Sequence, residues 1–181
     1  MHSLPPPMVA PRRQAVQSLI LGAVDGITTT FAILSGGVGG NVTTGSIAII
    51  AVSSLLADGV SMGISETLSA SVEAVGAREA RLGLVCGASF VVAGAMPLGA
   101  FLAMMSQAST VWAAMLVSGS VALLLLVGLG VVRGRTATTT MGRRRCTSVV
   151  QVVGLGGVAS VLAFVAGHVV HLLNVQLTSD A

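Results

Sequence analysis

Residues 110–132 read TVWAAMLVSGSVALLLLVGLGVV, an apolar run without a single charged side chain. A bilayer core of about 30 Å is crossed by roughly 20 helical residues, so this run is long enough to span a membrane. The chain contains five such runs, at residues 15–37, 46–72, 82–105, 110–132 and 149–173. They lack the alternation of barrel strands and are too long for them. The sequence therefore predicts an all-α polytopic membrane protein with five transmembrane helices.

The composition agrees with a surface that faces lipid. Only 8% of the 181 residues are charged and the mean hydropathy is +0.95, whereas a soluble domain carries about 25% charged residues. The length suits one domain. The net charge of +3 comes from arginines placed between apolar blocks, a pattern that argues against nucleic acid as a partner. Cys86 and Cys146 are expected to be free thiols.

The arginines predict the topology. They precede the first span, separate spans two and three, and separate spans four and five, whereas the loops GGVGGNVTTG and SQAST and the tail LNVQLTSDA contain none. By the positive-inside rule the arginine side is cytoplasmic. We therefore expect a disordered, Pro-rich cytoplasmic N-terminus (1–14), a transmembrane domain (15–173) and a lumenal or extracellular tail (174–181), in a vacuolar or plasma membrane. The arginines are Arg12, Arg13, Arg78, Arg81, Arg133, Arg135, Arg143, Arg144 and Arg145.

Glycines four residues apart lie on one helix face and let backbones approach closely. Three such pairs occur within or directly after the first two predicted helices: Gly22 with Gly26, Gly36 with Gly40, and Gly59 with Gly63. They fit either tight packing within one bundle or a dimer interface.

Acidic residues inside the predicted spans are the first candidates for function. Asp25, Asp58 and Glu66 have no Lys or Arg at the same depth. Placing Asp in a membrane costs roughly 2.5–3.5 kcal/mol on insertion scales, so such residues usually face a cavity, pair or bind a ligand. The alternative is a protonated carboxyl held by hydrogen bonds.

The second predicted helix arranges its polar residues in a stripe. Asp58, Met62, Glu66, Ser69 and Glu73 fall within about 80° of one another and rise over roughly 22 Å. Carboxylate oxygens with a thioether favour a divalent transition metal, and carboxylates that release metal can take protons. In the alternative interpretation, Met62 is a packing residue and Glu73 marks the water interface.

The remaining candidates are weaker. His168 and His171, near the lumenal end of the fifth helix, either receive metal or form an interfacial polar pair. The sequence contains no phosphate loop, no paired nucleophile and base, and no CxxC. We therefore expect no enzyme activity and no bound cofactor.

Four motifs carry a family resemblance. Residues 21–40 read LGAVDGITTTFAILSGGVGG and residues 57–71 read ADGVSMGISETLSAS, with weaker matches at residues 94–102 and 154–167. Over residues 18–170 the chain resembles the vacuolar iron transporter family, especially its nodulin-like and short bacterial members. It departs from the family pattern at Val24, where Asn is common, and at Ser54, where some members have Glu. The link between helices two and three also lacks the family's long acidic insertion.

The resemblance implies a five-helix homodimer whose metal path runs between protomers and is lined by the first two helices. It implies that Asp25 and Met62 are pore ligands and that Glu66 is the acidic residue of the Ser-Met motif. Members of the family move Fe²⁺, sometimes Mn²⁺, out of the cytosol in exchange for protons. Our leading hypothesis is therefore a proton-coupled exporter of divalent metal, with Asp25, Asp58, Met62, Glu66 and Glu73 as metal ligands. A proton-coupled exporter of small organic cations and a non-transporting membrane scaffold are the alternatives.

Overall fold

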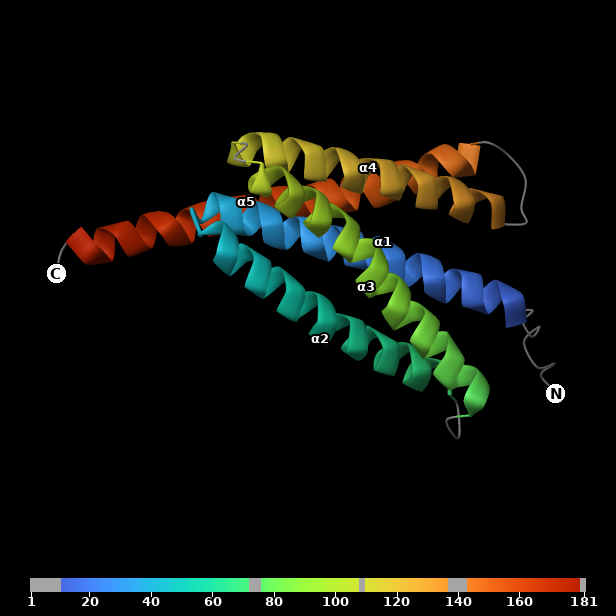
Figure 1. The fold of residues 1–181 in the computed structure, drawn as a ribbon. Coiled ribbons are helices and arrows are strands. Elements are labelled where there is room, and N and C mark those ends of the chain that lie inside the picture. Colours follow the sequence, from blue (N-terminus) through green and yellow to red (C-terminus); the bar gives the residue numbers. More distant parts are fainter. Residues whose placement is uncertain (1–10, 72–75, 108–109, 137–142, 180–181) are drawn as a thin grey trace, which may run out of the picture.

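The computed structural model is an all-helical bundle (Figure 1). It describes residues 11–71, 76–107, 110–136 and 143–179. The five helices are α1 (Pro11–Gly39), α2 (Thr44–Ala70), α3 (Ala77–Ser106), α4 (Val111–Thr136) and α5 (Arg143–Ser179). Each is long and apolar enough to cross a membrane, which confirms the predicted fold class. The protein is a multi-pass integral membrane protein.

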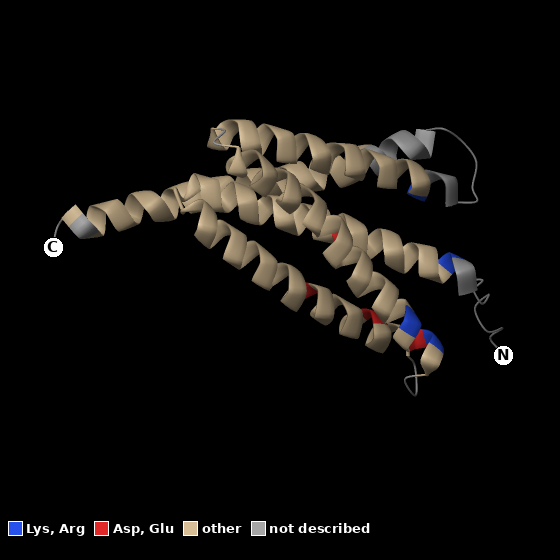
Figure 2. Cartoon of the chain, in the orientation of Figure 1, with Lys and Arg blue, Asp and Glu red and all other residues tan. Residues whose placement is uncertain are grey.

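The helices extend beyond the predicted spans. Helix α1 begins at Pro11, inside the segment predicted to be disordered, and α5 continues through most of the predicted tail, to Ser179. Figure 1 shows this end of α5 projecting past the other helices, and the start of α1 lies at the opposite end of the bundle. The described arginines whose positions Figure 2 marks lie at the end opposite to the projecting α5, as the topology prediction requires. Residues 1–10 of the segment predicted to be disordered lie outside the part of the chain that the structure describes.

The turn between α1 and α2 is set by local hydrogen bonds. Asn41 has a positive φ of 53°, a backbone conformation that Asn tolerates better than most residues. Its amide donates to the carbonyl oxygen of Val38 at 3.1 Å and so ends α1. The hydroxyl of Thr43 then accepts from the amide of Ser46 at 3.3 Å and caps α2.

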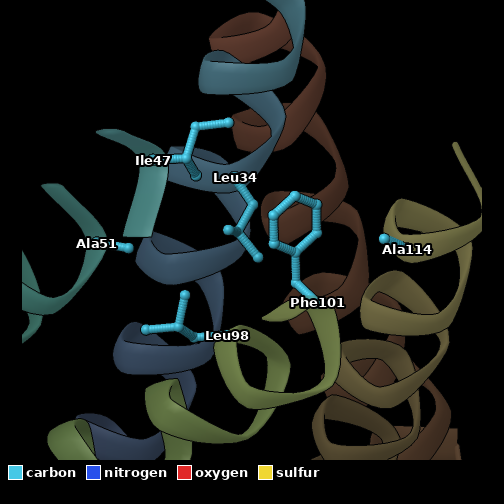
Figure 3. Close-up of a cluster of buried hydrophobic side chains, with 6 residues drawn as sticks. All are labelled: Leu34, Ile47, Ala51, Leu98, Phe101 and Ala114. Atoms are coloured by element: carbon cyan, nitrogen blue, oxygen red, sulfur yellow. The ribbon is translucent and has the colours of Figure 1, made fainter. Parts of the chain in front are cut away.

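Helix α1 lies at the centre of the bundle and packs against all four other helices, whereas the described residues of α2 contact only α1 and α3. A cluster of buried apolar side chains joins α1 to α4 near the arginine-free end (Figure 3). Phe101 of α3 is fully buried in it. The cluster consists of Leu34, Ile47, Ala51, Leu98, Phe101 and Ala114.

Close to this cluster, α3 contains Pro97, which removes one backbone donor from the helix. Its carbonyl oxygen accepts a hydrogen bond of 2.8 Å from the hydroxyl of Ser118 in α4. Ser118 is completely buried, so this bond satisfies a polar group that would otherwise be costly between helices.

All three glycine pairs named above contact other helices of the same chain. A Cβ built on Gly22 would lie 2.1 Å from the carbonyl oxygen of Cys86, and one on Gly26 would lie 2.2 Å from that of Phe90. The α1 backbone therefore lies directly on α3, and the buried Cys86 is a free thiol within this contact.

The other two pairs behave in the same way. A Cβ on Gly167 of α5 would lie 2.1 Å from the Gly36 carbonyl oxygen, and one on Gly87 of α3 would lie 2.4 Å from the Gly59 carbonyl oxygen. The glycine faces thus serve packing within one bundle, and they give no support to a dimer interface.

We predict that Gly87→Ala lowers the stability of the bundle by about 1–3 kcal/mol, because α2 and α3 must separate to admit the methyl group. Gly99→Ala is the matched control on the same helix, since nothing lies within 4 Å of a Cβ at Gly99. Thermal unfolding in detergent checks both variants. Equal melting temperatures for the two would contradict the assignment of the α2–α3 contact.

Candidate metal path

A groove of about 670 Å³ opens along α1, between α2 and α5. Asp25 is the one acidic residue that lines it, and Thr28 and Thr29 supply hydroxyls. The hydroxyl of Thr28 donates to the carbonyl oxygen of Val24 at 2.9 Å, so its oxygen remains able to accept or coordinate. The rest of the lining is apolar or glycine: Ala32, Ile33, Gly36, Gly37, Val42, Ile47, Ile50, Ala159 and Ala163. We call this the Asp25 groove.

Asp25 lies well inside the span. It follows Arg13 by twelve residues, which corresponds to about 18 Å along α1. Its side chain is exposed in the single chain, and Asp58 of α2 lies within electrostatic range of it. Asp25 is the one predicted ligand that lines the groove, because Asp58, Met62 and Glu66 are not among its lining residues.

Glu66 is held by a hydrogen bond that sequence reasoning missed. The hydroxyl of Ser18 in α1 donates to Glu66 Oε1. Ser18 is only 3% exposed, so this contact is made inside the helix packing. Its signal in the sequence was weak, because a lone Ser in an apolar helix is most often a packing residue. The bond directs the Glu66 carboxylate toward α1, on the same side of α2 as Asp58.

A second polar contact joins α1 and α3 nearer the basic end. The guanidinium of Arg78 donates to Gln14 Oε1. Arg78 is therefore engaged with the start of α1. Glu79 accepts from the amide of Gly76 at 3.1 Å and caps α3.

The predicted ligands form a ladder and not a closed cage. Asp58 and Glu66 are eight residues apart, or about 12 Å along α2, whereas protein ligands lie within about 2.0–2.6 Å of a bound divalent ion. No group of three His, Cys, Asp or Glu side chains within the described residues could surround one ion. Met62 is half-buried between them. Glu73 lies outside the described residues.

The histidine pair lies elsewhere. His168 is exposed and His171 is half-buried on α5, and neither lines the Asp25 groove. This placement does not support a role for either histidine in metal release.

The comparisons with known proteins include one match whose position in the chain is known, and it covers the helices that carry Asp25 and Asp58. The model of the VIT family matches residues 16–82. The matched residues include most of α1, all of α2 and the start of α3. The family resemblance drawn from the sequence is thereby confirmed over the segment that carries Asp25, Asp58, Met62 and Glu66.

Three proteins named vacuolar iron transporter align with 58 residues, or 32%, of this chain. The identity is 45% to the protein from Plasmodium berghei, 41% to that from Plasmodium falciparum and 40% to that from Toxoplasma gondii. The match spans about a fifth of the length of these VIT relatives, 21%, 21% and 19% respectively. No solved structure matches the chain significantly.

We predict that Ser18→Ala and Glu66→Gln are coupled. Because each removes part of one hydrogen bond between α1 and α2, the double variant should lose less stability than the sum of the single variants. The expected coupling is about 1 kcal/mol, within the range found for hydrogen bonds between membrane helices. Denaturant titration in mixed micelles measures it, and strictly additive losses would contradict the contact.

Proposed function

We propose that this protein is a proton-coupled exporter of a divalent transition metal, Fe²⁺ or Mn²⁺ or both, from the cytosol to a vacuole or the cell exterior. The observation that carries the proposal is the Asp25 groove: a carboxylate at membrane depth, open to the surface of the single chain, on the helix that matches the VIT family. The relatives' name, vacuolar iron transporter, supports metal as the transported substrate.

The cost of a membrane carboxylate supports a ligand role for Asp25. An acidic side chain facing lipid would be unfavourable by several kcal/mol. The described arginines lie at the end of the bundle and not at this depth (Figure 2). The groove offers hydroxyl oxygens from Thr28 and Thr29, which together with a carboxylate form a hard-ligand set suited to a divalent cation.

The same exposure supports a homodimer. Two copies related by a two-fold axis would present the same face to each other, so two Asp25 grooves would close into one path and bury both carboxylates away from lipid. One chain supplies too few converging ligands, and a second copy would double them. In this arrangement Asp58, Met62 and Glu66 would line the path from both protomers, with Glu73 at its cytoplasmic mouth.

The charge asymmetry supports an orientation for the proposed path. The positive-inside rule makes the arginine end cytoplasmic, so metal would enter near Glu73 and Glu66 and leave beyond Asp25 on the arginine-free side. Carboxylates bind metal only when they are deprotonated, so metal release and proton uptake compete at the same oxygens. An opposing proton gradient would therefore drive export.

Asp25→Asn should abolish metal flux, because the amide keeps the shape of the side chain and loses the charge that attracts the cation. The measurement uses proteoliposomes loaded with a metal-sensing dye, with an imposed proton gradient, and compares Fe²⁺, Mn²⁺, Zn²⁺ and Ca²⁺. Glu79→Gln is the matched control, since it makes the same chemical change outside the groove.

The outcomes separate the competing functions. Gradient-driven Fe²⁺ or Mn²⁺ flux that is lost in Asp25→Asn and kept in Glu79→Gln supports the proposal. Absence of flux for every metal, from protein that elutes as a folded species, would overturn it and leave the organic-cation exporter and the scaffold.

Met62→Leu should alter selectivity more than folding. Leu has nearly the same volume, so we expect a stability loss below about 1.5 kcal/mol, whereas loss of the thioether removes the softest ligand of the path. In the same flux assay the ratio of Fe²⁺ to Ca²⁺ transport should fall severalfold. An unchanged ratio would assign Met62 to packing.

A further inference from the structure

A second groove, of about 680 Å³, runs between α2 and α3. Its floor is formed by the glycines at which the two helices touch, Gly59 and Gly63 of α2 and Gly83 and Gly87 of α3. We call it the α2–α3 groove. Asp58 points about 160–180° away from the groove residues Val60 and Thr67 around α2, whereas Glu66 points about 100–120° away from them, on the flank of the groove.

The α2–α3 groove is apolar and open. Its outer wall includes Leu84, which is 72% exposed, and Ile64, which is 56% exposed. The lining has a single hydroxyl, that of Thr67, and it donates to the carbonyl oxygen of Gly63 in its own helix at 2.9 Å. The one hydroxyl of this lining already has a hydrogen-bond partner, whereas the Asp25 groove contains a carboxylate.

The length of the groove matches one leaflet. On α3 the lining extends from Ala80 to Val92, and on α2 from Leu68 to Leu56. Each stretch covers twelve residue steps, or about 18 Å, and half of a hydrocarbon core of about 30 Å is roughly 15 Å. The groove begins at the arginine end of the bundle, so it runs from that interface to about the middle of the membrane.

A basic side chain, that of Arg81, lies at the interfacial end of the α3 side of the groove. Arg81 is exposed, and it precedes Leu84, Ala88 and Val92 by three, seven and eleven residues. This spacing places all four on one face of α3. A guanidinium at that position reaches the headgroup region and suits bidentate binding of a phosphate.

We propose that the α2–α3 groove binds one acyl chain of an anionic phospholipid in the leaflet at the arginine end, with the lipid phosphate on Arg81. The one-leaflet length of the groove and the guanidinium at its interfacial end favour a lipid over a second copy of the chain, because an acyl chain occupies one leaflet and carries its phosphate at the interface. This inference does not depend on which substrate, if any, the protein transports.

The test is native mass spectrometry of the full chain, released from micelles that contain phosphatidylglycerol or phosphatidylcholine. Wild type should retain one phosphatidylglycerol per chain under activation that strips phosphatidylcholine. Ala88→Phe should reduce retention at least fivefold, because the exposed Ala88 lines the groove and a phenyl ring there fills it. The matched control is Ala95→Phe, on the same helix and also exposed, but outside the lining.

The headgroup contact has its own variants. Arg81→Gln should lower retention of phosphatidylglycerol about fivefold, toward that of phosphatidylcholine, as expected for one basic residue near an anionic surface. Arg133→Gln removes the same charge at the same end of the bundle, on α4, and should leave retention unchanged.

Two results would overturn the proposal. One is equal retention of phosphatidylglycerol by Ala88→Phe and Ala95→Phe. The other is a disulfide-linked dimer formed in a bilayer by Ala88→Cys in a Cys146→Ser chain, which would assign the groove to a second copy. If Ala88→Phe fails to elute as a folded species, Ala80→Phe at the interfacial end of the groove provides the same comparison.

Discussion

Direct backbone contact between helices, which glycine permits, is the constraint on which the rest of this structure depends. Lipid is as apolar as the side chains of these helices, so association in the membrane relies on close packing and on polar contacts. Helix α1 meets α3 at Gly22 and Gly26 and meets α5 at Gly36. These contacts keep α1 at the centre of the bundle. Asp25 therefore lies on the helix that packs against all four others.

The same constraint gives α2 two different faces. Its glycine face lies against α3, where Gly59 and Gly63 leave a shallow apolar groove. Its other face carries Asp58, Met62 and Glu66, of which Glu66 is held to α1 by Ser18. Asp58 points about 160–180° away from Val60 and Thr67, so these opposite sides of α2 are suited to different partners, whereas Glu66 flanks the glycine face.

Hydrophobic length was sufficient to predict the five helices, since each span is far longer than a soluble helix requires. The ends were less predictable: α5 continues past residue 173 because its tail has no helix breaker before Ser179. The spacing of the glycines predicted close packing but not its partner, which depends on the three-dimensional order of helices. Likewise, helical geometry predicted the shared face of Asp58 and Glu66, whereas the bond from Ser18 required knowledge of which helix lies opposite.

The two grooves differ in what their exposure costs. An open apolar groove in a membrane loses little, because lipid chains can fill it with contacts of the kind that a protein interior would make. An open carboxylate has no such substitute, because lipid chains offer neither hydrogen bonds nor charge. The Asp25 groove therefore requires a polar occupant, an ion or a second protein surface, while the α2–α3 groove does not. This asymmetry, more than the size of either groove, distinguishes a transport path from a lipid site in this bundle.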